Sequence, residues 1–313
     1  MKKLISYVVP FYNDQGNVEA LYQELLLVIS QQSYQRKYDY QFVFVNDGSR
    51  DSTLNDLKLV QKQDKRIKVI DLARNYGHQI AVTAGLEHTK GDAVIVMDSD
   101  LQDPPRVSLE LIEKWEAGYD VAYAQRRSRK DSFLKKLTAD IYYRLLQRIT
   151  EINIPRNTGD FRLMDRQVVD ELAKFREHNR FLRGMVSFVG FKQAAVLFDR
   201  DERFAGESGY SIKKLFKLAS DGIFSFSSVP LKFISRLGFT IAGLSVIGSI
   251  YAAAYKILTP GATVQGWTFI VISIFLIGGV QLVMLGVLGS YIGRIYTEVQ
   301  DRPLYSVYRI YEN

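Results

Sequence analysis

Residues 94–105 read Val-Ile-Val-Met-Asp-Ser-Asp-Leu-Gln-Asp-Pro-Pro, a stretch that begins apolar and ends in carboxylates and two prolines. Its apolar beginning, together with Ala93, is a short continuous run that is typical of a strand buried on both faces. The run ends directly at Asp98 and Asp100, and alternate residues of an extended chain point to the same side. We therefore predict a strand whose carboxyl end presents two converging carboxylates.

The pair Asp98 and Asp100 has the chemistry of a divalent cation site. Carboxylate oxygens without a neighbouring His or Cys suit Mg²⁺ or Mn²⁺ better than zinc. Such a site leaves coordination positions open, and the phosphate oxygens of a bound nucleotide are suitable ligands for them. The alternative is a solvated turn that Asp103 and the two prolines terminate, since isolated Asp-x-Asp triplets are common. The buried strand before the pair favours the metal site.

Strands and helices alternate on both sides of this stretch. Earlier strands are expected at residues 5–9, 42–45 and 69–72, each followed by a polar loop and a helix, and later strands at residues 121–124 and 194–198. This alternation predicts an α/β fold with a parallel-rich sheet and helices on both faces. Ligands of such sheets bind at the carboxyl ends of the strands. No Gly-x-Gly-x-x-Gly motif follows the first strand, so a dinucleotide site of the Rossmann type is not indicated.

The composition of the chain restricts its chemistry. With 313 residues, of which 47% are hydrophobic, the chain can bury a substantial core. It has no cysteine, which excludes disulfides, thiolate metal sites and thiol catalysis. The net charge of +7 suits an acidic partner: nucleic acid, nucleotide phosphate or an anionic membrane surface. The N-terminal apolar run is short and lacks a small-residue cleavage site, so we expect a strand and a cytosolic start rather than a signal peptide.

Two long apolar runs near the C-terminus, residues 237–258 and 267–292, predict two transmembrane helices. Each exceeds the roughly 20 residues that a helix needs to cross about 30 Å of hydrocarbon. The alternative, two buried helices of a soluble core, fits poorly with the length of the second run. Lys232 and Arg236 precede the runs, whereas the loop between them has no charge, so both ends are expected in the cytoplasm.

Residues 211–226 predict a basic amphipathic helix just before these runs, since apolar residues at helical spacing alternate with lysines. Such a helix most simply lies in the membrane interface. The alternative is a helix that faces the core or another subunit.

Five motifs occur in order along the chain. They are Val-Pro-Phe-Tyr-Asn-Asp at residues 9–14, Val-Asn-Asp-Gly-Ser-Arg-Asp-Ser-Thr at 45–53, Asn-Tyr-Gly at 75–77, Met-Asp-Ser-Asp-Leu-Gln-Asp-Pro at 97–104, and Gly-Asp-Phe-Arg-Leu at 159–163. This set resembles glycosyltransferase family 2, which has the GT-A fold. Within the family, the chain is similar to the polyisoprenyl-phosphate glycosyltransferases, relatives of dolichol-phosphate mannose synthase and of the GtrB-like bactoprenol glucosyltransferases. The resemblance covers essentially the whole chain.

The resemblance implies a domain organisation. A GT-A catalytic domain is expected at residues 1–207, an amphipathic membrane-interface segment at 208–232, two transmembrane helices at 233–296, and a cytoplasmic C-terminal tail at 297–313. The expected location is the inner cell membrane, with two spans and with the catalytic domain and both termini in the cytoplasm. Relatives also suggest a homo-oligomer, with a tetramer expected.

The resemblance implies roles for individual residues. The nucleotide sugar is expected to bind Pro10, Tyr12, Asp14, Asp47 and Asp98, and the metal ion Asp98, Asp100 and Gln102. The phosphate of the lipid acceptor is expected to bind Arg126, Lys136 and Arg203, and Asp160 matches the catalytic carboxylate. Many relatives have Lys where this chain has Gly209, so another cation must replace that lysine if it binds phosphate.

The expected reaction is the inverting transfer of a sugar from a UDP-sugar to undecaprenyl phosphate, which gives a lipid-linked donor for cell-envelope glycans. Glucose is the expected sugar, and N-acetylglucosamine is the next choice. One alternative is a non-catalytic membrane scaffold that binds nucleotide sugar. A processive polysaccharide synthase would need a Gln-x-x-Arg-Trp-like motif, which neither Trp115 nor Trp267 provides. Nucleic-acid binding would rest on charge alone, and we expect membrane lipids as partners and no nucleic acid.

Overall fold

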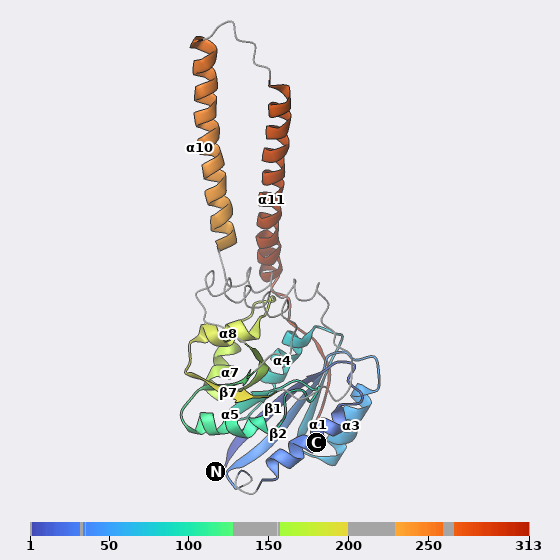
Figure 1. Ribbon diagram of the computed structural model, residues 1–313. Coiled ribbons are helices and arrows are strands. Elements are labelled where there is room, and N and C mark those ends of the chain that lie inside the picture. Colours follow the sequence, from blue (N-terminus) through green and yellow to red (C-terminus); the bar gives the residue numbers. More distant parts are fainter. Residues whose placement is uncertain are drawn as a thin grey trace. The chain divides into compact units, whose positions relative to one another are not determined.

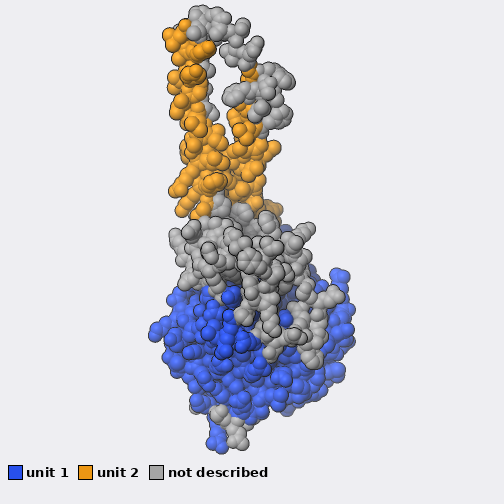
Figure 2. Space-filling model, viewed as in Figure 1, with its two compact units in different colours: residues 1–148, 152–222, 302–313 blue, residues 149–151, 223–301 orange. Residues whose placement is uncertain are grey.

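The computed structural model describes residues 2–31, 34, 36–127, 155, 157–199, 229–258 and 266–312. The chain divides into two compact units (Figure 2). Unit 1 comprises residues 1–148, 152–222 and 302–313, and unit 2 comprises residues 149–151 and 223–301. The two units are described separately below.

Unit 1 is built on a sheet of eight strands in the order β7-β5-β6-β4-β1-β2-β3-β8 (Figure 1). The strands are β1 (Lys3–Phe11), β2 (Tyr38–Asn46), β3 (Ile67–Leu72), β4 (Ala93–Val96), β5 (Val121–Arg126), β6 (Thr158–Asp165), β7 (Gln193–Phe198) and β8 (Val307–Tyr311). β1 pairs in parallel with β2 and β4, and β2 with β3. β6 runs antiparallel between β4 and β5. The predicted α/β class is confirmed, and the sheet is mixed: β5 also pairs in parallel with β7, whereas β3 and β8 are antiparallel.

Helices follow the first three strands of unit 1 as predicted: α1 (Val18–Ile29), α3 (Thr53–Gln63) and α4 (His78–Glu87). The other helices among its described residues are α5 (Val107–Glu116), α7 (Arg166–Leu172) and α8 (Leu182–Val189). α4 lies very close to the sheet, because a Cβ atom on Gly85 would come within 2.3 Å of Cγ1 of Val8. This glycine, near the C-terminal end of α4, therefore allows that part of the helix to lie close to Val8 of β1.

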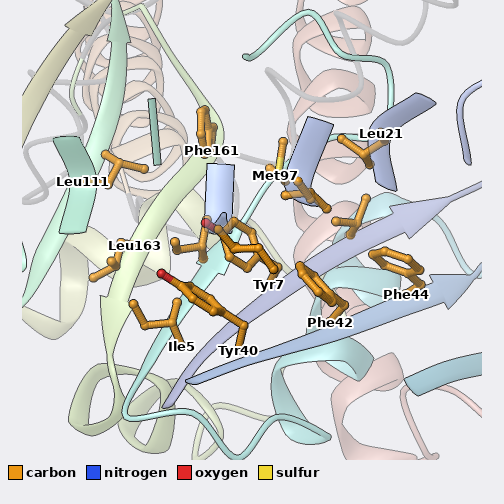
Figure 3. Packing of buried hydrophobic residues seen from close by; sticks show 14 of the residues in the cluster. Ile5, Tyr7, Leu21, Tyr40, Phe42, Phe44, Met97, Leu111, Phe161 and Leu163 are labelled. Atoms are coloured by element: carbon orange, nitrogen blue, oxygen red, sulfur yellow. The ribbon is translucent and has the colours of Figure 1, made fainter. Parts of the chain in front are cut away.

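The core of unit 1 is formed by aromatic and branched side chains of the central strands. Figure 3 shows Tyr7, Phe42 and Phe44 side by side on the sheet, with ring centroids 5.7 Å apart for Tyr7 and Phe42 and 6.1 Å apart for Phe42 and Phe44. The buried hydroxyl of Tyr7 forms a 2.8 Å hydrogen bond with Oγ of Ser108 on α5. A rigid sheet of this kind fixes the loops at its carboxyl edge.

The end of the chain returns to unit 1. Residues 297–313 were expected to form a tail, but Val307–Tyr311 is strand β8, which pairs antiparallel with β3. The 302–306 segment is also attached, since Nε2 of His178 lies 2.8 Å from the carbonyl oxygen of Arg302. Part of the predicted C-terminal tail is therefore a strand that pairs with an open edge of the sheet, and the predicted domain boundaries stay a prediction.

Unit 2 contains the helices α10 (Val229–Leu258) and α11 (Trp267–Val299). Among the described residues, one segment, Leu276–Val299, has the length and composition needed to cross a membrane. The hairpin of two transmembrane helices therefore stays a prediction. Most of the predicted interface segment at residues 208–232 lies outside the described residues.

Candidate active site

The candidate site lies at the carboxyl edge of the central strands. The loops after β1, β2, β3 and β4 reach this edge because these four strands are mutually parallel. β6 runs the other way, with Val96 opposite Arg162, so its first residues lie at the same edge. Asp160, near the start of β6, is therefore placed beside the loop that follows β4.

The turn after β4 holds the predicted metal ligands. Asp98 and Asp100 are half-buried, and Oδ1 of Asp100 accepts a 3.2 Å hydrogen bond from the backbone N–H of Gln102. Leu101 has a φ of 57°, which is left-handed and uncommon for a residue with a side chain. Strained backbone of this kind is concentrated at functional sites. The hydrogen bond from Gln102 to Asp100 stabilises the conformation of this turn, as does the contact of Ser99 with Asp14.

The loop after β1 is tied to this turn through Asp14. Oδ2 of Asp14 accepts a 2.6 Å hydrogen bond from the hydroxyl of Ser99, and the backbone N–H of Asp14 donates to Oγ1 of Thr53 at 2.8 Å. Pro10 is buried in β1, whereas Tyr12 is 44% exposed beyond the strand. Of the residues predicted to bind the nucleotide, Tyr12 therefore offers an accessible aromatic face, and Asp14 holds two loops together.

Asp47, which is predicted to bind the nucleotide, also holds the loop after β3. Its side chain is buried, and its two oxygens accept hydrogen bonds from the backbone N–H groups of Tyr76 and Gly77 at 2.7 and 2.9 Å. Burial raises the pKa of Asp47, although these two N–H groups oppose the rise. Asp47 thus fixes the loop that leads into α4.

Asp160 is the most strongly bound carboxylate of the site. Its Oδ2 atom lies 3.0 Å from Nε2 of His78 and accepts a 3.0 Å hydrogen bond from Nε2 of Gln79. Its Oδ1 atom accepts a 2.8 Å hydrogen bond from Nε of Arg183. The first two partners open α4 and the third lies in the first turn of α8. Three donors from two helices therefore surround one buried anion.

These contacts determine the charge of the cluster. Burial alone would raise the pKa of Asp160, but Arg183 and His78 hold it well below its usual range. Burial alone would lower the pKa of His78, but the hydrogen bond to Asp160 and the charge of Asp98 raise it to about 9. At neutral pH, the cluster therefore contains an ionised Asp160 and a cationic His78.

Asp98 approaches the same ring nitrogen of His78 as Asp160, with 3.6 Å between Oδ1 of Asp98 and Nε2 of His78. Burial raises the pKa of Asp98, and His78 opposes this, whereas the charges of Asp160 and Asp100 add to it. A divalent cation between Asp98 and Asp100 would compensate this crowding of negative charge, so the donor set fits Mg²⁺ or Mn²⁺. Within the described part of the chain, no group of three or more His, Cys, Asp or Glu side chains is arranged to hold a metal ion.

Arg126, at the end of β5, also reaches this edge. Its Nη2 atom lies 3.6 Å from Oδ1 of the buried Asp103. Gly159 lies between them, since a Cβ atom there would be 3.3 Å from Oδ2 of Asp103 and 3.5 Å from Nη2 of Arg126. The glycine next to Asp160 thus leaves space for this pair. Lys136 and Arg203, the other two predicted phosphate ligands, lie outside the described residues.

The sequence did not assign roles to His78, Gln79 and Arg183. The available signal was the position of the first two, directly after a strand and its polar loop, at the edge where ligands bind. Arg183 gave no such signal, because its contact with Asp160 depends on how α8 packs on the sheet.

Known proteins with similar sequences identify the family. Residues 6–173 match the model of glycosyl transferase family 2. The uncharacterized glycosyltransferase YkcC of Bacillus subtilis is 48% identical over 307 residues, which cover 98% of this chain and 94% of YkcC. The bactoprenol glucosyl transferase of Shigella phage SfII is 40% identical over 306 residues, which cover 97% of each protein.

A solved structure with a similar fold is that of glucosyl-3-phosphoglycerate synthase from Mycobacterium tuberculosis in complex with Mn²⁺, uridine diphosphate and glucosyl-3-phosphoglycerate. It has 17% sequence identity and a TM-score of 0.47, with 71% of this chain and 78% of that chain covered. The family match and the full-length relatives confirm the resemblance that the five motifs indicated. This chain belongs to glycosyl transferase family 2 and is a glycosyltransferase.

Proposed function

We propose that this glycosyltransferase transfers glucose from UDP-glucose to undecaprenyl phosphate. The observation that supports the chemistry is the position of His78, which lies 3.0 Å from Asp160 and 3.6 Å from Asp98. The predicted metal ligand and the predicted catalytic carboxylate therefore share one site. The sugar and the acceptor are supported by the relative named bactoprenol glucosyl transferase, which is 40% identical over 97% of this chain.

The reaction is a single displacement. An oxygen of the acceptor phosphate forms a bond to the anomeric carbon, the bond from that carbon to the diphosphate breaks, and UDP leaves. This inverts the anomeric centre, so an α-linked donor gives a β-linked product. The acceptor is a phosphate monoester with a second pKa of about 6. At neutral pH it is therefore mostly a dianion, which needs no deprotonation before it attacks.

Asp160 suits an electrostatic and orienting role better than proton removal. Its pKa is held below its usual range, and a carboxylate of this kind is a poor base. Its charge is fixed in place by His78, Gln79 and Arg183. A preorganised anion next to the reacting carbon would stabilise the positive charge that develops there.

Asp98 and Asp100 are the residues that would hold Mg²⁺ or Mn²⁺, with Gln102 next to them in the turn. When bound, the ion would act as a Lewis acid on the diphosphate, where negative charge grows. Mg²⁺ is commonly bound by one or two carboxylates together with substrate phosphates, which matches this pair. Tyr12 and Asp14 would contact the nucleoside part of the donor.

Positive charge is needed because donor and acceptor are both anions. Arg126 supplies a guanidinium at the edge where Asp160 lies, and guanidinium groups bind phosphate oxygens in a bidentate manner. We assign the lipid phosphate to Arg126 together with Lys136 and Arg203. Truncation of Arg126 would therefore raise the KM for the lipid acceptor more than the KM for UDP-glucose.

The proposed location is the inner cell membrane. α10 and α11 would form the two spans, the sites of unit 1 and both termini would lie in the cytoplasm, and the chain would form a homo-oligomer in contact with membrane lipids. The apolar segment Leu276–Val299 supports insertion of α11.

The test is transfer of radiolabel from UDP-glucose, UDP-N-acetylglucosamine, other UDP-sugars and GDP-mannose to undecaprenyl phosphate. Purified full-length protein is supplied with Mg²⁺ or Mn²⁺, and label is counted in the organic phase. We expect metal-dependent label from UDP-glucose. If label is transferred only from another donor, the sugar of that donor is the substrate and the assignment of glucose is wrong. If no donor transfers label and the protein still binds nucleotide, the non-catalytic scaffold is favoured.

A further inference from the structure

Gln79 connects three elements of the site through one side chain. It is the second residue of α4, and its Nε2 atom donates a 3.0 Å hydrogen bond to Oδ2 of Asp160 on β6. Its Oε1 atom accepts a 2.9 Å hydrogen bond from the backbone N–H of Leu182, the first residue of α8. The side chain therefore spans from one helix to a strand and to a second helix.

The chemistry of the two partners requires an amide at this position. The ionised carboxylate of Asp160 only accepts hydrogen bonds, and a backbone N–H only donates. Glutamine has one group of each kind at its end, so its orientation is fixed by its partners. Glutamate would keep the contact with Leu182 and turn an acceptor toward Asp160, and methionine would keep the length and lose both bonds.

The contact with Leu182 also stabilises the start of α8. The first N–H groups of a helix have no partner within the helix, and the N-cap residue Phe181 makes no side-chain capping bond. Gln79 supplies that acceptor from another element. The next residue, Arg183, donates from Nε to Oδ1 of Asp160 at 2.8 Å. Gln79 thus fixes one oxygen of Asp160 directly and the partner of the other oxygen indirectly.

α4 is a firm base for this contact. Gly85 allows the helix to lie against Val8 so closely that a side chain could not fit between them. The loop before α4 is held by Asp47, which accepts from the N–H groups of Tyr76 and Gly77. The helix that carries Gln79 is therefore held near both ends, by Asp47 through the loop before it and by the close approach of Gly85 to the sheet.

We propose that Gln79 is a positioning residue for sugar transfer: it orients the carboxylate of Asp160 and aligns Arg183 with it. This inference rests on the proposed function. Gln79 acts through Asp160 and has no assigned contact with substrate. Its loss would lower the rate of the chemical step and leave binding of the nucleotide sugar nearly unchanged.

The experiment compares Gln79→Glu and Gln79→Met with wild type, as full-length protein in detergent with undecaprenyl phosphate and UDP-glucose. A misplaced catalytic group can cost about 100-fold in rate, and we expect kcat to fall by roughly 10- to 100-fold in both variants. We expect the KM for UDP-glucose to stay within about twofold. Gln79→Glu should lose at least as much kcat as Gln79→Met, since it places a like charge against Asp160.

The order of the two variants separates positioning from a purely structural role. If Gln79 only links α4 to α8, Gln79→Glu keeps the bond to Leu182 and should retain kcat while Gln79→Met loses it. That result, or wild-type kcat in both variants, would overturn the proposal. Thermal unfolding and UDP-glucose titration show whether each variant is folded. If one variant does not fold, the kcat of the other is compared with wild type, and a wild-type kcat would overturn the proposal.

The matched control is Gln193→Met, since Nε2 of Gln193 donates to the carbonyl oxygen of Val186 on α8 at 3.3 Å. Gln193 also contacts α8, but it has no contact with Asp160. The kcat of the Gln193→Met variant should therefore stay within about twofold of wild type. If the wild-type protein transfers no sugar at all, the proposed function fails. If it transfers sugar and the Gln79 variants do so equally well, only the positioning role fails.

Discussion

Asp160 is buried and Asp98 is half-buried, both lie near Nε2 of His78, and their surroundings shift their pKa values in opposite directions. Asp160 accepts hydrogen bonds from His78, Gln79 and Arg183, and its pKa is well below the usual range. Burial raises the pKa of Asp98, and nearby Asp160 and Asp100 add to this. The negative charge of Asp160 is balanced by hydrogen-bond donors of the chain itself. The negative charge of Asp98 would be balanced best by a bound cation.

The largest effect is expected at the predicted metal ligands, Asp98 and Asp100. Asp100→Ala should reduce transfer more than about 100-fold, because the cation would lose one of its two carboxylates. Radiolabel in the organic phase measures this. Asp170→Ala, which changes a 62% exposed side chain in α7, is the control and should keep wild-type activity. Full activity of Asp100→Ala would exclude Asp100 as a metal ligand.

The next effect tests the charge of Asp160. Asp160→Asn keeps the shape of the side chain and removes the anion that three donors hold. We expect kcat to fall by roughly 100-fold, since preorganised charge near the reacting carbon contributes effects of this size. Isothermal titration should show UDP-glucose binding within about threefold of wild type. An unchanged kcat would mean that the donors serve folding alone.

A smaller effect is expected when a donor is removed and the anion stays. Arg183→Met leaves Asp160, whose side chain is 6% exposed, with His78 and Gln79 only. We expect the free energy of unfolding to fall by about 2 kcal/mol, because a buried charge loses a partner. Chemical denaturation measures this. In the double variant Arg183→Met with Asp160→Asn, the loss should be smaller than the sum of the single losses.

The smallest effect is expected at Asp64, a carboxylate outside the candidate site. As in Asp160, cationic hydrogen-bond donors lower its pKa although burial opposes this. Burial alone would raise the pKa of Asp64, but hydrogen bonds from Arg66 lower it below its usual value. Its stabilisation is therefore present above the unfolded pKa and is lost as pH falls through the folded pKa. Asp64→Asn should cost less than roughly 1 kcal/mol at neutral pH, because Arg66 is 41% exposed.

Denaturation of this variant and of wild type at neutral pH and near about pH 3 checks the sign. The difference in the free energy of unfolding should shrink at the lower pH. A difference that grows on acidification would show that Asp64 is not held as an anion.

Local patterns in the sequence were sufficient for the first four strands and for their polar loops. The run at residues 93–97 and the carboxylates after it are at the predicted place, since a buried parallel strand is apolar throughout. β6 and β8 were not predicted. Their pairing depends on which edges other strands leave open, and no periodicity within residues 158–165 or 307–311 reports that.

The candidate site was predictable only in part for the same reason. Asp98, Asp100 and Asp160 belong to motifs of local sequence, and the structure brings Asp98 and Asp160 to the same nitrogen, Nε2, of His78. The partners of Asp160 are distant in the sequence: His78 and Gln79 are the first two residues of α4, and Arg183 belongs to α8. Asp47 matched a nucleotide-binding motif, yet its oxygens hold the backbone of Tyr76 and Gly77.

The pairing of β8 with β3 also constrains how the chain can be threaded through a bilayer. β3 precedes α10 and β8 follows α11, and both strands belong to one sheet, so both lie in the same aqueous compartment. The polypeptide between them must then cross any membrane an even number of times. Under the proposed membrane location, crossing by Leu276–Val299 would require a further crossing between β3 and β8; α10 has the length for it, but among the described residues Leu276–Val299 is the one segment that also has the apolar composition.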